Sequence, residues 1–196
     1  MSAGIMADKK NQPPLVSIVT PAYNAEAYLR ECIESVLAQT YPNWDYTIVN
    51  NCSTDHTLDI AREYAARDSR IRVRCNEKHV GVIENHNIAF RQISPMSKYC
   101  KGLQADDWLF PECIEKMVKL AEKHPKVAIV CAYALVGRQP PVVGYTGLPH
   151  SITVDTGGRE ACRLRLLGGP YVFGTSSTQL FRSDILRSRQ IGRAHV

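Results

Sequence analysis

Short β-forming runs alternate with helical patterns from residue 15 to residue 131, and this alternation constrains the fold more than any other feature. Strands are expected at residues 16–20, 46–49, 71–74, 99–103 and 127–131. Helices are expected at residues 25–39, 53–67, 82–92 and from residue 111 onward. Strands and helices joined by short links predict an α/β fold, with a mainly parallel central sheet and helices on both faces. The 44% apolar content is enough to fill such a core.

Two helical patterns carry recognisable signals. Asn24 stands where an N-cap is expected for the first helix, and Pro111 is typical of the first turn of a helix. The expected buried stripe of the first helix is Leu29, Cys32, Ile33, Val36 and Leu37. That of the later helix is Ile114, Met117, Val118 and Ala121. Beyond it, we expect a Pro/Gly-rich loop at residues 137–147, a helix at 155–167 and a strand at 177–181.

Several classes of protein are disfavoured. The longest apolar run, residues 127–136, is too short to span a bilayer, and the N-terminus has no apolar signal core. The seven scattered cysteines favour reduced core residues over zinc ligands or disulfides. No glycine-rich dinucleotide or Walker loop follows a strand, no Gly-x-Ser-x-Gly elbow is present, and no basic patch interleaved with aromatics indicates nucleic acid. The net charge of +5 is concentrated after residue 137 as arginine, which is compatible with phosphate, acidic lipid or simply water.

Asp106 and Asp107 follow the fourth expected strand directly. Two adjacent carboxylates at the end of a buried strand repel one another unless a cation, donors or water offset their charge. A divalent cation carrying a phosphorylated ligand is one solution. The alternative is a solvated Asx turn that caps the helix near Pro111.

Other polar groups follow the first two strands. Ligands of open α/β sheets bind beyond the carboxyl ends of the strands. Residues 21–24, residues 50–53 and the Asp106–Asp107 pair should therefore meet at one edge of the sheet. This convergence favours a ligand site over an isolated helix cap.

Three side chains near this edge have a functional and a structural interpretation each. Tyr23 could cover a nucleobase or ribose, or pack over the first helix. Asn51, next to Asn50, could pair with a base edge, or form a turn. His86 could reach a phosphate from the start of its helix, or be an ordinary helix residue.

These residues resemble the family-2 glycosyltransferases of the GT-A fold over about residues 15–187. The resemblance rests on five ordered blocks: residues 16–24 (VSIVTPAYN), 29–41 (LRECIESVLAQTY), 48–55 (IVNNCSTD), 81–87 (GVIENHN) and 103–107 (LQADD). The last block is similar to the family's Leu-Asp-Ala-Asp-Asp metal motif. A GT-A-type, Rossmann-like sheet is therefore implied.

The resemblance implies inverting, metal-dependent transfer of a sugar from a nucleotide-diphosphate donor to an acceptor hydroxyl. By position, Asp107 would bind Mg²⁺ or Mn²⁺, and Asp106 would contact the ribose or assist the metal. The nucleotide-sugar would also be framed by Thr20, Pro21, Tyr23, Asn51 and His86. A saccharide or lipid-linked acceptor, a role in cell-surface polysaccharide or glycoconjugate synthesis, and a cytoplasmic location compatible with peripheral membrane association are implied as well.

Three positions depart from the family pattern: Asn51 replaces Asp, His86 replaces Arg, and Gln104 replaces the first Asp of the metal motif. These departures keep open a degenerate nucleotide-sugar-binding module. A nucleotidyltransferase is a further alternative, although residues 21–24 lack the Gly-rich, basic loop that it would need.

The resemblance also implies a division of the chain. We expect a disordered tail at residues 1–14, a donor-binding half at 15–136 and the start of an acceptor-side half at 137–190. Residues 191–196 match one reading frame of a common sequencing adapter, so the natural chain is expected to continue past residue 190. The resemblance implies a general base there, because the family places it shortly after the segment that resembles residues 177–186. Asp155, Glu160 and Asp184 are not at the matching position, and Asp184 is better interpreted as a helix N-terminal residue.

Overall fold

The structure is a computed structural model, and it describes residues 12–137, 142–144, 157–168 and 174–188. The expected tail at 191–196, the expected position of the general base and residues 1–11 lie outside these ranges. Pro13 and Pro14, from the expected N-terminal tail, are described. Their carbonyls accept hydrogen bonds from Asn43 Nδ2 and the Tyr41 hydroxyl. Within the described ranges, no helix combines the length and the apolar character needed to cross a bilayer.

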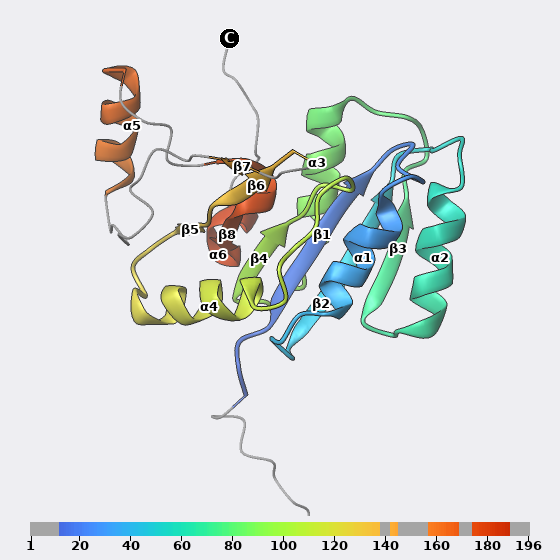
Figure 1. The fold of residues 1–196 in the computed structure, drawn as a ribbon, viewed down its shortest axis with the longest axis horizontal. Coiled ribbons are helices and arrows are strands. Elements are labelled where there is room, and N and C mark those ends of the chain that lie inside the picture. Colours follow the sequence, from blue (N-terminus) through green and yellow to red (C-terminus); the bar gives the residue numbers. More distant parts are fainter. Residues whose placement is uncertain (1–11, 138–141, 145–156, 169–173, 189–196) are drawn as a thin grey trace, which may run out of the picture.

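A six-stranded sheet forms the centre of the molecule (Figure 1). Its parallel strands are β1 (Val16–Ala22), β2 (Trp44–Asn50), β3 (Ile71–Cys75) and β4 (Tyr99–Gly102), in the order β3-β2-β1-β4. Beyond β4, strand β8 (Gln179–Arg182) runs antiparallel between β4 and β5 (Ile129–Cys131). The mainly parallel α/β sheet is thus confirmed.

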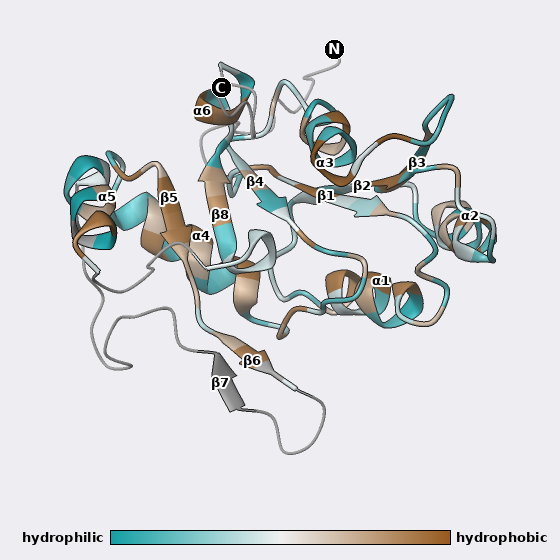
Figure 2. Ribbon diagram, turned by 90° about the horizontal axis from the view of Figure 1, so that it is seen from above, coloured by the Kyte–Doolittle hydropathy of each residue, from teal (hydrophilic) through white to brown (hydrophobic). Residues whose placement is uncertain are grey.

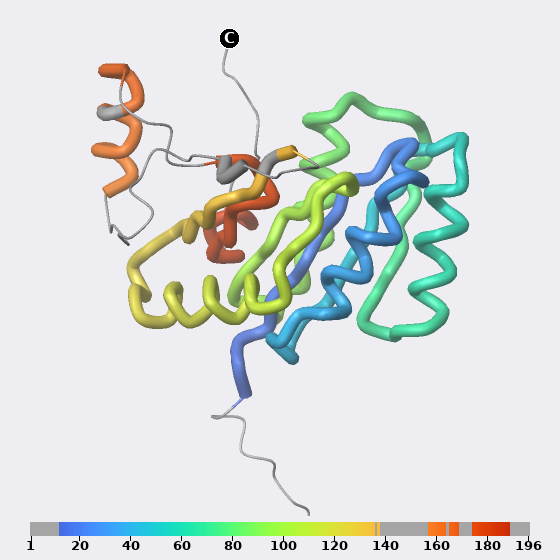
Figure 3. Tube along the Cα trace, in the orientation of Figure 1, coloured from blue at the N-terminus to red at the C-terminus, as the bar shows by residue number. Residues whose placement is uncertain are grey.

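The chain path in Figure 3 shows β8 returning from late in the sequence to lie beside β4. Residues from both sides of the expected division at 136/137 therefore contribute to one sheet.

Helices cover both faces of the sheet, as Figure 2 shows. On one face, α1 (Leu29–Leu37), α2 (Thr57–Arg67) and α4 (Cys113–Lys123) bury their apolar stripes against alternate strand residues such as Ile18 and Ile48. On the other face, Val19, Val49 and Cys100 pack with residues of α3 (Val82–Phe90) and with Leu186 of α6 (Ser183–Arg187). The predicted stripe of α4 is buried in full.

Asn24 does not cap α1, which begins at Leu29 after a turn at residues 25–28. Its backbone adopts a left-handed φ of 46°, a region that asparagine tolerates better than most residues. Its Oδ1 accepts the Thr54 N–H at 2.9 Å, while its own N–H donates to Ser53 Oγ at 3.0 Å. Asn24 therefore links the loops that follow β1 and β2, and the predicted N-cap was wrong.

The expected loop at 137–147 contains a strand. Strand β6 (Ala134–Val136) pairs antiparallel with β7 (Val142–Gly144) in a separate two-stranded sheet. Gly137, at a φ of +95°, supplies the left-handed conformation just after β6. The prediction of a loop, based on Pro and Gly content alone, missed the pairing of β6 with β7. The helix expected at 155–167 is observed as α5 (Gly158–Leu166).

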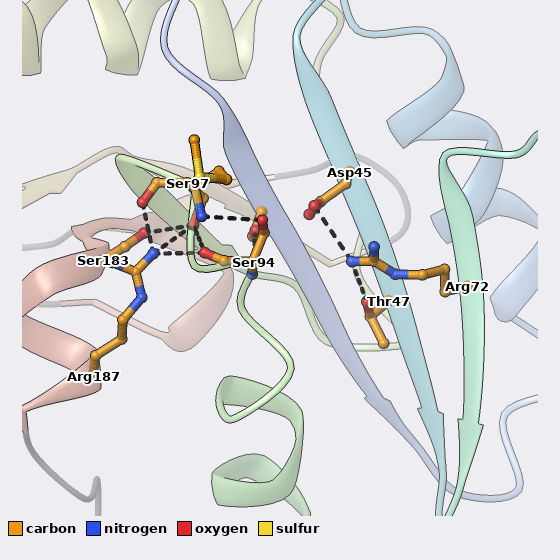
Figure 4. Close-up of polar contacts among 9 residues, drawn as sticks. Asp45, Thr47, Arg72, Ser94, Ser97, Ser183 and Arg187 are labelled. Carbon is orange, nitrogen blue, oxygen red and sulfur yellow. Dashed lines mark hydrogen bonds and ion pairs between the residues drawn. The ribbon is translucent and has the colours of Figure 1, made fainter.

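One arginine fixes α6 to the segment that precedes β4 (Figure 4). Arg187 Nη2 donates to the carbonyls of Ser94 and Ser97 at 2.6 and 2.8 Å, and the Ser97 hydroxyl lies 3.1 Å from that of Ser183. Nearby, Arg72 pairs with Asp45 at 3.3 Å on the same face of the sheet. Asp184 lies in the first turn of α6, as expected.

Candidate active site

The strand order reverses between β1 and β4, because β2 and β3 follow β1 on one side and β4 lies on the other. Ligands of open α/β sheets bind at this point, beyond the carboxyl ends of the strands. Pairing of β4 with β1 ends at Gly102 and Val19, whereas β1 continues beside β2 as far as Ala22. The loop after β4 therefore leaves the sheet beside the last residues of β1.

Asp106 and Asp107 lie in that loop, in a turn closed by a 3.1 Å hydrogen bond from the Asp107 N–H to the Gln104 carbonyl. Asp106 is exposed and Asp107 is half-buried. Among the described residues, neither carboxylate has a hydrogen-bond or ion-pair partner. Helix α4 begins only at Cys113, with Glu112 at its N-cap. The helix-capping alternative for the pair is therefore wrong.

The donor set of this turn suits a hard divalent cation. The described residues contain no group of three or more His, Cys, Asp and Glu side chains that could hold a metal ion. Mg²⁺ commonly binds through one or two carboxylates and takes its remaining ligands from substrate phosphates and water. Two carboxylates in the turn after β4, neither with a partner among the described side chains, fit that pattern.

Pro21 lies near the end of β1, and Tyr23 directly follows this strand. Tyr23 is 48% exposed, and its ring centroid lies 4.6 Å from that of His79, with the planes tilted by 59°. The exposed ring is accessible for stacking, whereas the alternative of packing over α1 would bury it. Pro21 is half-buried. Thr20 is fully buried, and its Oγ1 accepts from the Tyr46 hydroxyl at 2.8 Å. The Thr20 side chain thus faces the core.

Asn51 is 2% exposed, and its amide is largely used within the protein. Its Oδ1 accepts from Asn76 Nδ2 at 2.8 Å and from the Val80 N–H at 3.0 Å, while its Nδ2 donates to the Val80 carbonyl at 2.8 Å. Asn51 therefore holds the segment that precedes α3. One N–H of its amide is left for the predicted contact with a base edge.

His86 lies on the first turns of α3, between the backbone and Gln104. Its Nδ1 is 2.8 Å from the Val82 carbonyl, and its Nε2 is 3.0 Å from Gln104 Nε2. A carbonyl only accepts, so the proton is on Nδ1, and the Gln104 amide donates to the lone pair of Nε2. Two of the three departures from the family pattern are thus in direct contact.

Two buried side chains, Cys32 and Lys101, lie next to the Asp106–Asp107 turn and the segment η1 (Ser176–Thr178) that contacts it. The Cys32 thiol donates to the Gln104 carbonyl at 3.5 Å, and burial raises the pKa of Cys32 to about 12. Lys101, on β4, is completely buried and donates to the carbonyls of Ser177 and Gln179. Burial lowers the pKa of Lys101 from 10.5 to about 8, while the negative charge of Asp107 acts in the opposite direction.

The sequence contained signals for two residues of the site that were missed. Asn76 comes directly after β3, at the same edge of the sheet, and its amide donates to both Asn51 and Asn85. Lys101 is a charged residue inside an otherwise apolar strand. Ser176 and Ser177, which contact Gln104, have no local signal, because they are distant in sequence.

Comparison with known proteins identifies the family. The profile of the family described as "Glycosyl transferase family 2" matches residues 17–188. This chain belongs to glycosyltransferase family 2. It is 33% identical, over 146 residues, to the Bacillus subtilis protein described as "Putative teichuronic acid biosynthesis glycosyltransferase TuaG", covering 74% of this chain and 57% of that protein. The chain spans about half the length of such relatives.

Solved structures share the fold. The structure of Staphylococcus aureus TarS residues 1–349 in complex with UDP aligns with a TM-score of 0.69 at 21% identity, covering 88% of this chain and 48% of that one. The mannosyltransferase PcManGT from Pyrobaculum calidifontis, in complex with GDP-Man and Mn²⁺, aligns with a TM-score of 0.56 at 22% identity, over 63% and 37% of the two chains. The expected GT-A fold is confirmed.

Proposed function

We propose that this chain is the donor-binding part of an inverting, cation-dependent glycosyltransferase that uses a nucleotide-diphosphate sugar. The observation that carries the proposal is the Asp106–Asp107 turn, whose carboxylates have no partner among the described residues and follow β4 where the strand order reverses. Family membership supports transfer of a sugar, and the UDP and GDP-Man complexes of the two structural neighbours support a nucleotide-linked donor.

The residues of the site take separate roles in this proposal. Asp107, with Asp106 assisting or contacting the ribose, would hold Mg²⁺ or Mn²⁺. When bound, the cation supplies positive charge that stabilises the leaving nucleoside diphosphate. Tyr23 would stack on the base or ribose with its exposed ring. Asn51 would offer its remaining amide N–H to the base, and His86 would face the phosphates from the start of α3.

The test is calorimetric binding of UDP, GDP and dTDP to the 196-residue chain, with Mn²⁺ and with EDTA. We expect one nucleotide to bind more tightly with Mn²⁺, and Asp107→Asn to lower that affinity by about tenfold or more, as is typical when a metal site is disturbed. Asp59→Asn, an exposed carboxylate on α2, is the matched control and should bind like the unmodified chain. Absence of nucleotide binding under all conditions would refute the proposal.

The wider biology follows from the same proposal. TuaG is described as acting in teichuronic acid biosynthesis, which supports a role in cell-surface polysaccharide synthesis. The saccharide or lipid-linked acceptor, the membrane association and the cytoplasmic location remain predictions. A catalytically degenerate binding module would bind the nucleotide with Mn²⁺ yet transfer no sugar to an acceptor.

A further inference from the structure

Gln104, in the candidate site, makes hydrogen bonds through its side chain, its backbone N–H and its backbone carbonyl. Its side-chain Nε2 lies 3.0 Å from His86 Nε2 and 2.6 Å from Ser176 Oγ. Its backbone N–H donates to Ser177 Oγ at 3.0 Å. Its carbonyl accepts the Asp107 N–H at 3.1 Å and the Cys32 thiol at 3.5 Å. A residue bonded through its side chain and both backbone groups has little freedom to move.

The partners of Gln104 come from separate parts of the chain. His86 belongs to α3, on one side of the loop, while Ser176 and Ser177 belong to the 3₁₀ turn η1 (Ser176–Thr178), which leads into β8. That turn is itself held, because the buried ammonium of Lys101 donates to the Ser177 carbonyl. The loop that carries the two carboxylates is therefore fixed between α3 and η1, and Gln104 makes both connections.

The position of this loop would affect a cation held there, because a metal ion requires its carboxylate ligand at a defined place. Groups that orient metal ligands without touching the metal commonly change metal affinity by about 10- to 100-fold when they are removed. The Asp107 N–H is tied directly to Gln104, so a displacement of Gln104 is transmitted to the carboxylate through the turn.

We propose that Gln104 is the positioning residue of the cation site, and that it sets the place of Asp107 by joining His86 of α3 to Ser176 of η1. The inference rests on the proposed function and adds to it a residue that does not touch the ligand. It also makes η1, from late in the chain, a part of the donor site.

The first experiment measures UDP binding to Gln104→Leu, which keeps the size of the side chain and removes its hydrogen bonds. We expect the Mn²⁺-dependent affinity to fall about tenfold, while affinity in EDTA changes less than about twofold. Gln92→Leu is the matched control, because among the described residues the side-chain amide of Gln92, just past α3, bonds to the Ile88 carbonyl alone. Equal losses with Mn²⁺ and with EDTA would overturn the proposal, since they would indicate a general structural effect.

A double-mutant cycle tests the contact itself. If Ser176 acts through Gln104, Ser176→Ala combined with Gln104→Leu should lose no more Mn²⁺-dependent affinity than Gln104→Leu alone. Fully additive losses would overturn that connection. Hydrogen exchange without ligand gives an independent readout: Gln104→Leu should speed exchange of the Asp107 amide about fivefold, with the amides of α2 unchanged. An unchanged Asp107 amide would overturn the positioning role.

The outcomes separate the two proposals. An unmodified chain that shows no Mn²⁺-dependent nucleotide binding would refute the proposed function and the role of Gln104 with it. An unmodified chain that binds with Mn²⁺, together with a Gln104→Leu variant of equal affinity, would refute only the role of Gln104.

Discussion

Lys101 makes the stability of this protein depend on pH in a way that one substitution should remove. The ammonium is completely buried on β4 and, within the part of the chain that the structure describes, bonds to the carbonyls of Ser177 and Gln179. Burial lowers the pKa of Lys101 from 10.5 to about 8 in the folded state. The unfolded chain therefore binds this proton at a higher pH than the folded chain does.

The sign follows from that difference. As the pH falls from 10.5 to 8, the unfolded state takes up the proton while the folded state resists it, so folding loses stability. Each unit of difference between the two pKa values corresponds to roughly 1.4 kcal/mol of folding free energy. Below pH 8 both states are charged, and the buried charge then lowers the free energy of unfolding by its full amount, about 3 kcal/mol. Relative to a variant without this charge, the free energy of unfolding should therefore rise by about 2 kcal/mol between pH 7 and 9.5.

The assay is urea unfolding of the chain and of Lys101→Met at several values between pH 7 and 9.5. Only the difference between the two proteins is informative, because cysteines and tyrosines titrate in both. The level at pH 7 is not diagnostic, since methionine removes the cost of the buried charge but leaves the Ser177 carbonyl without its donor. Lys119→Met, on the exposed side of α4, controls for charge removal. Parallel profiles for the chain and Lys101→Met would refute the reasoning.

Three further predictions concern single side chains. Tyr23→Ala should change stability by less than about 0.5 kcal/mol, because the ring is exposed, but should weaken UDP binding about fivefold by calorimetry, with Tyr23→Phe near the unmodified value. Asn51→Ala removes three buried hydrogen bonds and should lower the free energy of unfolding in urea by about 2–3 kcal/mol. Arg187→Ala should speed amide exchange in α6 while leaving β1 protected, because Arg187 fixes α6 to the carbonyls of Ser94 and Ser97.

Much of the fold could be predicted from sequence because its signals are local. Within α4, within β1 and within β2, the buried residues lie only a few positions apart. The periodicity of each element is therefore visible without a structure. The insertion of β8 between β4 and β5 was not visible, since pairing partners distant in sequence leave no periodic trace. The pairing of β6 with β7 was missed for a related reason, because both strands are short and lie next to a Pro/Gly-rich stretch.

In the candidate site too, residues with a local sequence signal could be predicted and contacts between distant residues could not. Tyr23, Asn51 and the Asp106–Asp107 pair follow strand ends, and the parallel topology brings those ends to one edge. The residues that hold them in place could not be predicted. Ser176 contacts Gln104 across 72 positions of sequence, and no spacing rule predicts such a contact. Sequence motifs therefore predicted which residues gather at this edge of the sheet better than which residues hold them there.

The charges of the site lead to a last prediction about its ligand. The Asp106–Asp107 pair has no cationic partner among the described residues. Both ring nitrogens of His86 are taken up by the Val82 carbonyl and the Gln104 amide, and the ammonium of Lys101 donates to the carbonyls of Ser177 and Gln179. A diphosphate brought to this turn without a metal adds like charge to like charge. With Mn²⁺, UDP should therefore bind more tightly than UMP, whereas in EDTA at low ionic strength UDP should bind no more tightly than UMP. If calorimetry in EDTA finds UDP the tighter ligand, positive charge from elsewhere in the protein must reach the phosphates, and the cation would lose the role argued for it here.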